Sequence, residues 1–213
     1  MSATAETNKA RVMVGRLLGG AVVGAAGTGL FLVFVGEPHM NLKDPSVMLA
    51  IVAGVSYVLI GLLVAVGLVA PSAGARFLNV EDAEEIREER PKLGSSALSC
   101  VLTGCFLLVL ALSGGGVIAA GAALAIAVLC LGGMIVLGWI SMKRYDELTR
   151  QMGQEASAWA FYATLLLFGG WAALAQLGFT GWVDPLGFVA SLAMLQLVAI
   201  FVAVARRGLM MPR

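Results

Sequence analysis

Long stretches without a charged side chain dominate the sequence. They cover residues 17–36, 45–75, 93–142, 156–183 and 186–205. A transmembrane helix needs about 20 consecutive, predominantly apolar residues. Each stretch is therefore long enough for one membrane helix, and the stretch 93–142 is long enough for two. The sequence predicts six transmembrane helices, with spans at about residues 14–36, 46–70, 95–113, 117–140, 156–178 and 185–205.

The two helices predicted within residues 93–142 need a turn between them. Ser113 is followed by three consecutive glycines, Gly114 to Gly116. Glycine adopts the positive φ angles of tight turns at little steric cost, so we place the turn here. The resulting fold class is all-α: a polytopic membrane protein whose six transmembrane helices form three hairpins in a single membrane domain of residues 1–213.

Two of the predicted helices begin with the same pair of residues. Asp44-Pro45 precedes the second span, and Asp184-Pro185 precedes the sixth. An Asp side chain accepts hydrogen bonds from the free N–H groups of a first helical turn. Pro fits the first helical position, because its missing N–H is not needed there. We therefore expect both Asp residues to be N-caps.

Basic residues divide unevenly between the two sides of the predicted bundle. Every Lys and Arg except Lys43 lies in the N-terminal arm, in the connections 76–92 and 143–155, or after residue 205. Cytoplasmic segments of membrane proteins are enriched in Lys and Arg. The pattern predicts a bacterial inner-membrane location, with both termini and the short loops 76–92 and 143–155 in the cytoplasm. Within the second of these loops, an apolar stripe at helical spacing predicts that helix continues between the fourth and fifth spans.

The composition agrees with a membrane protein and limits its partners. Hydrophobic residues make up 60% of the 213 residues and charged residues 13%, whereas soluble domains contain about 45–50% and about 25%. So much apolar surface requires the lipid bilayer as a partner. The formal net charge of +1 argues against nucleic acid, because binding to phosphates requires an excess of basic residues.

The sequence contains none of the catalytic or cofactor-binding patterns that we considered. There is no phosphate-binding G-x-x-x-x-G-K-[ST] loop, no H-E-x-x-H of a zinc protease and no G-x-S-x-G around a nucleophilic serine. The single histidine, His39, cannot supply both axial ligands of a membrane haem. Cys100, Cys105 and Cys130 lie inside apolar runs, and we interpret them as small hydrophobic residues. We therefore expect a protein that is not an enzyme and that has no cofactor or metal.

A few polar side chains, and no side chain that ionises at neutral pH, are predicted at the middle of the membrane. The four of interest are Ser56, Thr103, Tyr162 and Gln196. An amide such as that of Gln196 is costly in hydrocarbon without a partner. One interpretation is hydrogen bonding between helices, worth about 1 kcal/mol per contact. The other is a pathway for a small solute, in a transporter or channel without an intramembrane ionisable relay.

The first predicted span is rich in glycines that recur at intervals of four residues with other small residues. They are Gly15, Gly19, Gly20, Gly24 and Gly29. Small residues at this spacing share a helix face and allow another backbone to approach closely. We expect this helix either to lie at the centre of the bundle or to bind a membrane-protein partner or a second copy of the chain.

The densest polar feature is the acidic segment 81–89. A helix directs neighbouring carboxylates away from one another, and the spacing matches no calcium-binding loop, so we do not expect a cation site here. A solvent-exposed helix face and a docking site for a partner are both open interpretations.

Residues 146–161 carry a further pattern, which reads D-E-x-x-R, then E-A, then A-F as the fifth span begins. This arrangement resembles a pattern of uncharacterised bacterial multi-span inner-membrane proteins. The resemblance implies a multi-span membrane fold and implies no functional residue.

These features favour a non-enzymatic integral membrane protein that acts by helix–helix contact, as an accessory or scaffold subunit of a membrane assembly. The alternative is a small-solute transporter or channel. A continuous polar cavity that reaches the middle of the membrane would favour the alternative. A closed bundle with an exposed face of Gly and Ala residues would favour the first interpretation.

Overall fold

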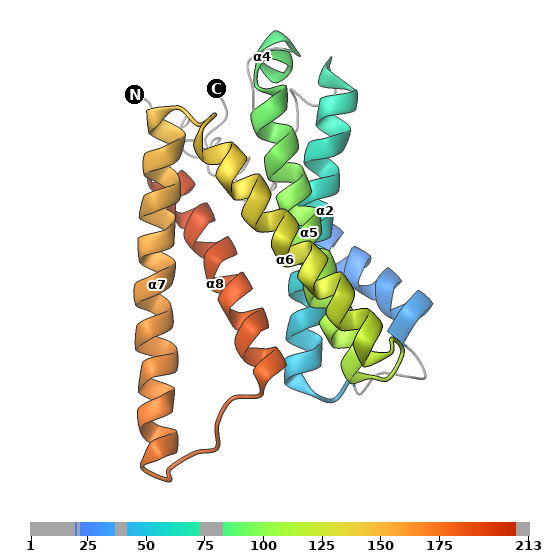
Figure 1. Ribbon diagram of the computed structural model, residues 1–213, viewed down its shortest axis with the longest axis vertical. Helices are drawn as coiled ribbons and strands as arrows, with labels where there is room; N and C mark the ends of the chain where they lie inside the picture. The colour runs from blue at the N-terminus through green and yellow to red at the C-terminus, as the bar shows by residue number, and fades with distance from the viewer. Residues whose placement is uncertain (1–19, 21, 37–41, 73–82, 208–213) are drawn as a thin grey trace, which may run out of the picture.

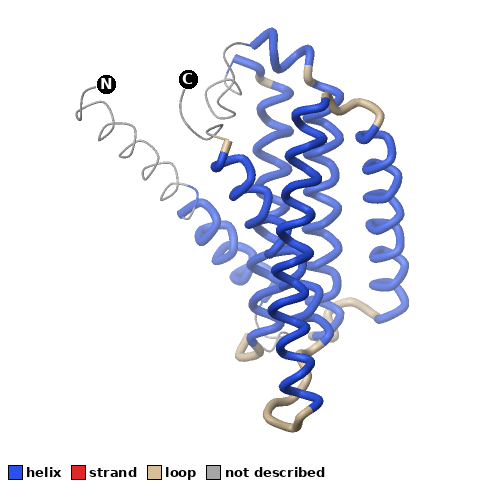
Figure 2. Tube along the Cα trace, turned by 90° about the vertical axis from the view of Figure 1, so that its left-hand side faces the viewer, coloured by secondary structure: helices blue, strands red, loops and turns tan. Residues whose placement is uncertain are grey.

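Helices and the short connections between them make up the whole of the described chain. The computed structural model describes residue 20 and residues 22–36, 42–72 and 83–207. No strand occurs within these ranges (Figure 2), which confirms the all-α class. The first element is the N-terminal helix (Val22–Phe34), and the short π-helix η1 (Leu32–Gly36) overlaps its end. The elements that follow, in chain order, are α2 (Pro45–Val69), α4 (Ala83–Glu88), α5 (Arg90–Gly114), α6 (Ala120–Met142), α7 (Glu147–Gln176) and α8 (Pro185–Arg206).

Five helices, α2 and α5 to α8, are long and apolar enough to cross a membrane. The length and apolar character of these helices indicate that the protein is located in a membrane. The N-terminal helix is apolar but shorter, and residues 14–19 of the predicted first span lie outside the described residues. The arrangement as six spans in three hairpins therefore stays a prediction.

The two Asp-Pro pairs begin helices as the sequence predicted. An Asp44 side-chain oxygen accepts a hydrogen bond from the Ser46 backbone N–H at 2.8 Å. An Asp184 side-chain oxygen accepts from the N–H groups of Leu186 and Gly187, at 3.0 and 3.3 Å. Pro45 and Pro185 are the first residues of α2 and α8. We call the end of the bundle where these helices begin the Asp-cap end.

Glycines in the left-handed conformation end α5 and α7. Gly116 has a φ of 75°, and the N–H of Val117 bonds to the carbonyl of Leu112 at 3.0 Å. Gly178 has a φ of 80°, and the N–H of the residue after it bonds back to the carbonyl of Leu174 at 3.0 Å. Both ends show the Schellman pattern, in which a residue without a Cβ satisfies the last carbonyls of the helix. The turn predicted at residues 113–116 is confirmed.

The closest helix contact is between α2 and α5, and glycines make it possible. A Cβ atom added to Gly54 would lie 3.1 Å from the carbonyl oxygen of Gly104, and one added to Gly61 would lie 2.7 Å from that of Ala97. Residues 54 and 61 are as far apart in sequence as residues 97 and 104, so the two helices repeat the same contact in antiparallel register. Backbones that meet this closely gain van der Waals contact, which is the main attraction between helices in lipid.

The remaining helices are arranged around this pair (Figure 1). α2 contacts α5 on one side and α8 on another, α6 packs on α5, and α7 packs on α8. The fully buried side chains of Ile51 and Leu107 belong to a core that α2, α5 and α8 share. Figure 2 shows the N-terminal helix at the opposite edge of the bundle from α6. α7 also lies at an edge in Figure 1, and Ala156 and Ala160 are its only buried residues.

α7 includes most of the connection 143–155, which the sequence predicts to continue as helix between the fourth and fifth spans. The helix begins at Glu147, and an oxygen of Asp146 caps it by accepting from the Thr149 N–H at 3.4 Å. Its 30 residues correspond to a length of about 45 Å, at about 1.5 Å per residue. This exceeds the hydrocarbon thickness of about 30 Å, so the first turns of α7 extend beyond the membrane core.

Candidate functional site

The four polar residues predicted at membrane depth do not converge on one site. Thr103 lies between α5 and α6, where its hydroxyl donates to the Ser99 carbonyl at 2.9 Å and contacts the Met134 sulfur at 3.0 Å. Tyr162, on α7, has 60% of its surface exposed and packs edge-to-face against Phe161. These two side chains are thus held on different helix surfaces, one between helices and one on the outside.

Ser56 on α2 and Gln196 on α8 are both half-buried. Across the described ranges, neither side chain forms a hydrogen bond. A hydrogen-bonded partner for Gln196, which we expected on a neighbouring helix, is thus not found among the described residues.

The polar contact between α2 and α8 is made instead by Tyr57, the residue after Ser56. The Tyr57 hydroxyl donates to the carbonyl oxygen of Ala193 at 2.9 Å, and the side chain is 7% exposed. Successive residues of a helix point about 100° apart, as its 3.6 residues per turn require. The sequence places both Ser56 and Tyr57 at membrane depth, but only the packing shows which of them reaches the neighbouring helix.

A second set of polar contacts lies at the other end of the bundle, where α5 and α7 begin and α6 and α8 end; we call it the basic end. The hydroxyls of Ser141 and Ser95 are 2.9 Å apart and join α6 to α5. The hydroxyls of Tyr145 and Ser96 are 3.2 Å apart. These contacts fix the position of the connection 143–146 against the start of α5.

Ion pairs at the basic end join α7 to the end of α8, and the start of α5 to the residue that caps α7. Glu155 of α7 lies 3.0 Å from Arg207 and 3.9 Å from Arg206, at the end of α8. Lys92 pairs with Glu89 at 3.1 Å and approaches Asp146 at 3.9 Å. The hydrogen bond from Thr149 lowers the pKa of Asp146 below its ordinary value, and the charge of Lys92 acts in the same direction.

Tryptophans mark both ends of the bundle. At the basic end, Lys143 lies 5.9 Å from the ring centroid of Trp139 and Arg206 lies 5.5 Å from that of Trp159. At the Asp-cap end, the Trp171 indole N–H donates to the Gly181 carbonyl at 2.8 Å. Trp is enriched where membrane meets water, because its ring is apolar and its N–H is polar. The two sets of tryptophans therefore agree with five helices that cross a bilayer.

The glycines of the first predicted span differ in their surroundings. Gly15 and Gly19 lie outside the described residues. A Cβ atom added to Gly20, Gly24 or Gly29 would have no neighbouring atom within 4 Å. Gly27, which the sequence analysis did not single out, makes the described contact with α2: a Cβ there would lie 2.6 Å from a methyl group of Leu59.

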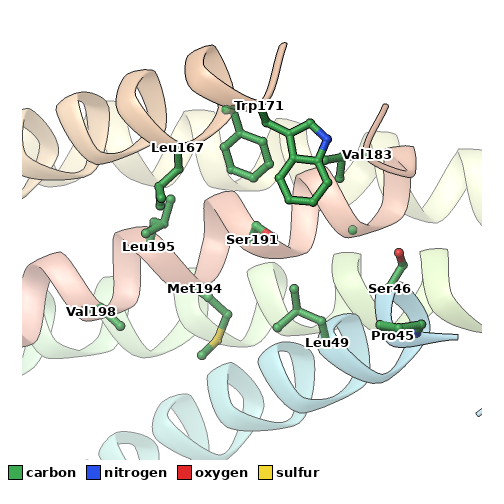
Figure 3. Close-up of a pocket in the computed structure, with 12 residues that line it drawn as sticks. Pro45, Ser46, Leu49, Leu167, Trp171, Val183, Ser191, Met194, Leu195 and Val198 are labelled. Atoms are coloured by element: carbon green, nitrogen blue, oxygen red, sulfur yellow. The ribbon is translucent and has the colours of Figure 1, made fainter. Parts of the chain in front are cut away.

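A groove lies between α2, α7 and α8 at the Asp-cap end (Figure 3). Its volume is about 480 Å³. Its walls are mostly aliphatic and aromatic, and none of the four predicted polar residues takes part. The lining residues are Pro45, Ser46, Leu49, Leu167, Phe168, Trp171, Val183, Gly187, Ser191, Met194, Leu195 and Val198.

The acidic segment is described from residue 83 onward, and there it forms α4. Ile86, on this short helix, is 1% exposed and is among the most buried side chains of the described chain. α4 contacts both α5 and α2. We did not predict a role for Ile86 from the sequence. An apolar side chain within the acidic segment is nevertheless a signal that this helix packs on the bundle. For the segment 81–89, a solvent-exposed helix face and docking of a partner stay alternative interpretations.

No group of three or more His, Cys, Asp or Glu residues in the described part of the chain is placed to hold a metal ion. The features that the described residues form are contacts between helices, ion pairs at the basic end and an apolar groove. Comparison with models of known protein families finds no match, and searches of characterised proteins and of solved structures find none either.

Proposed function

We propose that this chain is a non-enzymatic membrane protein that acts by helix–helix contact, as an accessory or scaffold subunit of a membrane assembly. The observation that carries the proposal is the open space beside Gly20 and Gly24, which lie four residues apart on one face of the N-terminal helix segment. Small residues allow helices in lipid to approach closely, which is how such helices associate. Within the described chain nothing fills this space, so it is available to a helix of a partner or of a second copy.

The polar side chains support the same proposal. Thr103 and Tyr57 use their hydroxyls in contacts within or between helices of this chain. A solute pathway would instead need polar side chains facing a common cavity. The groove between α2, α7 and α8 is apolar and lies to one side of these residues. This favours the assembly role over a small-solute transporter or channel.

The proposed setting is the bacterial inner membrane, with both termini in the cytoplasm. The uneven distribution of Lys and Arg supports this orientation. The basic end would then face the cytoplasm and the Asp-cap end the opposite compartment. The pattern over residues 146–161 and its resemblance to multi-span inner-membrane proteins belong to the same proposal.

Affinity purification of the tagged full-length chain in a mild detergent tests the assembly role. We expect a second membrane protein, or a second copy of the chain, to co-purify in a fixed ratio. A chain that remains a monomer, both in mild detergent and after cross-linking in intact membranes, would contradict the proposal. Uptake or efflux of a small solute by vesicles that contain only this protein would favour the alternative.

A further inference from the structure

The groove between α2, α7 and α8 lies at one end of helices that are long and apolar enough to cross a membrane, so its occupant must be compatible with lipid. It begins at Pro45, on the first turn of α2, and at Val183, just before α8. It ends at Val198, and 13 residues of helix separate Pro185 from Val198, or about 20 Å at about 1.5 Å per residue. The hydrocarbon core is about 30 Å thick. The groove therefore covers little more than one leaflet.

The size of the groove fits a single hydrocarbon chain. A transmembrane helix about 10 Å wide and 30 Å long occupies roughly 2,000 Å³ or more, so only a few of its side chains could enter the groove of about 480 Å³. A water-sized group occupies about 30 Å³, and a methylene group is of similar size. The groove thus has room for roughly 16 such groups, which is the size of one acyl chain.

The walls have the chemistry that such a chain requires. Leu49, Leu167 and Leu195 present aliphatic surface from three different helices (Figure 3). Phe168 adds aromatic surface to the lining. Each buried CH₂ gains about 0.8 kcal/mol relative to water. Relative to bulk lipid the gain is smaller, and it comes from contact with three walls at once. A chain held in this way should exchange more slowly than lipid on an open helix surface.

Polar groups occur near the mouth of the groove. Trp171 forms a wall there while its N–H is bonded to the Gly181 carbonyl. Lys43 is exposed two residues before Pro45, and its positive charge can meet a phosphate. The carboxylates of Asp44 and Asp184 are occupied as helix caps. A phospholipid would place its charged headgroup at this level and one acyl chain between the helices.

We propose that the groove between α2, α7 and α8 binds one acyl chain of a phospholipid from the leaflet at the Asp-cap end. The bound lipid fills the space between α7 and α2, which do not pack directly on one another over an extended surface. This inference does not depend on the assembly role, because it concerns lipid held within one copy of the chain.

Photolabelling of the wild-type, full-length protein tests the proposal. The probe is a phosphatidylethanolamine with a diazirine in one acyl chain, added in increasing amounts to the protein in mild detergent, with labelled peptides identified by mass spectrometry. Labelling of Leu49, Met194 and Leu195 should saturate at about one lipid per chain. Labelling of Leu129, which is 73% exposed on α6, should increase in proportion to the probe. The proposal would be overturned if the groove residues were not labelled, or if their labelling increased in proportion to the probe as that of Leu129 does.

A variant that fills the groove provides a second measurement. Ser191→Trp should reduce groove labelling by at least about tenfold, which corresponds to about 1.4 kcal/mol of binding free energy. Leu129→Trp, the matched substitution on the lipid-facing surface of α6, should leave groove labelling unchanged. Equal labelling of both variants would contradict the assignment. If Ser191→Trp does not fold, saturation in the wild-type protein still decides the question.

Discussion

Gly104 of α5 faces the carbonyl oxygen of Gly54 on α2 so closely that a Cβ atom added to Gly104 would lie 2.5 Å from that oxygen. The neighbouring atoms are backbone and the side chain of Val58, and backbone cannot move aside without separating the helices. This contact is at the centre of the pair on which the other membrane helices are arranged. The stability of the bundle should therefore depend on it.

We expect Gly104→Ala to lower the free energy of unfolding by about 1–3 kcal/mol, the usual cost of overpacking a close contact. Thermal unfolding in detergent measures the change. Gly132→Ala is the matched control, because a Cβ at that position of α6 meets no atom within 4 Å. Equal unfolding temperatures for the two variants would show that α2 and α5 are not in this contact.

Tyr57 provides a second prediction about helix packing. Removal of its hydroxyl in Tyr57→Phe deletes the hydrogen bond to the Ala193 carbonyl and should cost about 0.6–1 kcal/mol. Tyr162→Phe should have no measurable effect on unfolding, because Tyr162 is exposed and, among the described residues, its hydroxyl has no hydrogen bond. A larger loss for Tyr162→Phe than for Tyr57→Phe would reverse the assignment of the polar contact between α2 and α8.

Asp146 gives a prediction about pH. Its pKa is lowered in the folded protein by the hydrogen bond from Thr149 and by Lys92, so the ionised form stabilises the fold. This contribution is complete above the unfolded pKa of about 3.9 and is lost as the pH falls through the lower folded pKa. Asp146→Ala should cost about 0.5–1 kcal/mol at pH 7 through loss of the cap. Asp146→Asn should keep most of the cap and lose this part of the acid dependence. A stability difference between wild type and Asp146→Asn that does not change from pH 7 to pH 3 would contradict this account.

Membrane orientation can be checked with reporter fusions. A reporter that is active only in the cytoplasm should give signal after Arg213, and one that is active only in the periplasm should not. A fusion within residues 177–184, between α7 and α8, should give the opposite result. Signal from the periplasmic reporter after Arg213 would contradict the orientation inferred from the basic residues.

Much of the fold follows from the sequence, because each helix is determined by local features. Charge-free runs of about 20 residues or more predict the five membrane-length helices. Asp44 and Asp184 mark two helix starts, and the glycines at 114–116 mark the turn between α5 and α6. The connection before the fifth span is also predicted to be helical, because Leu148 and Met152 lie four residues apart on one face, but its start at Glu147 is not fixed by that spacing.

The packing could not be predicted in the same way. The chain contains 27 glycines, and no local signal distinguishes Gly54 and Gly104, which meet in the fold, from Gly24, which has open space beside it. Which side chain faces a neighbour depends on the rotation of the helix, as Ser56 and Tyr57 illustrate. The groove likewise forms only when α2, α7 and α8 come together, so no single segment indicates it.

We propose that the open face with Gly20 and Gly24 on the N-terminal helix segment binds another membrane helix, and a pair of glycine variants tests this most directly. Gly24→Ile adds a branched side chain where the described chain leaves space, whereas Gly27→Ile adds one against Leu59 of α2. We expect Gly24→Ile to keep the unfolding temperature of the wild type and to lose the partner or second copy in affinity purification. Gly27→Ile should instead lower the unfolding temperature. Retention of the full amount of co-purified partner by a folded Gly24→Ile protein would contradict the claim.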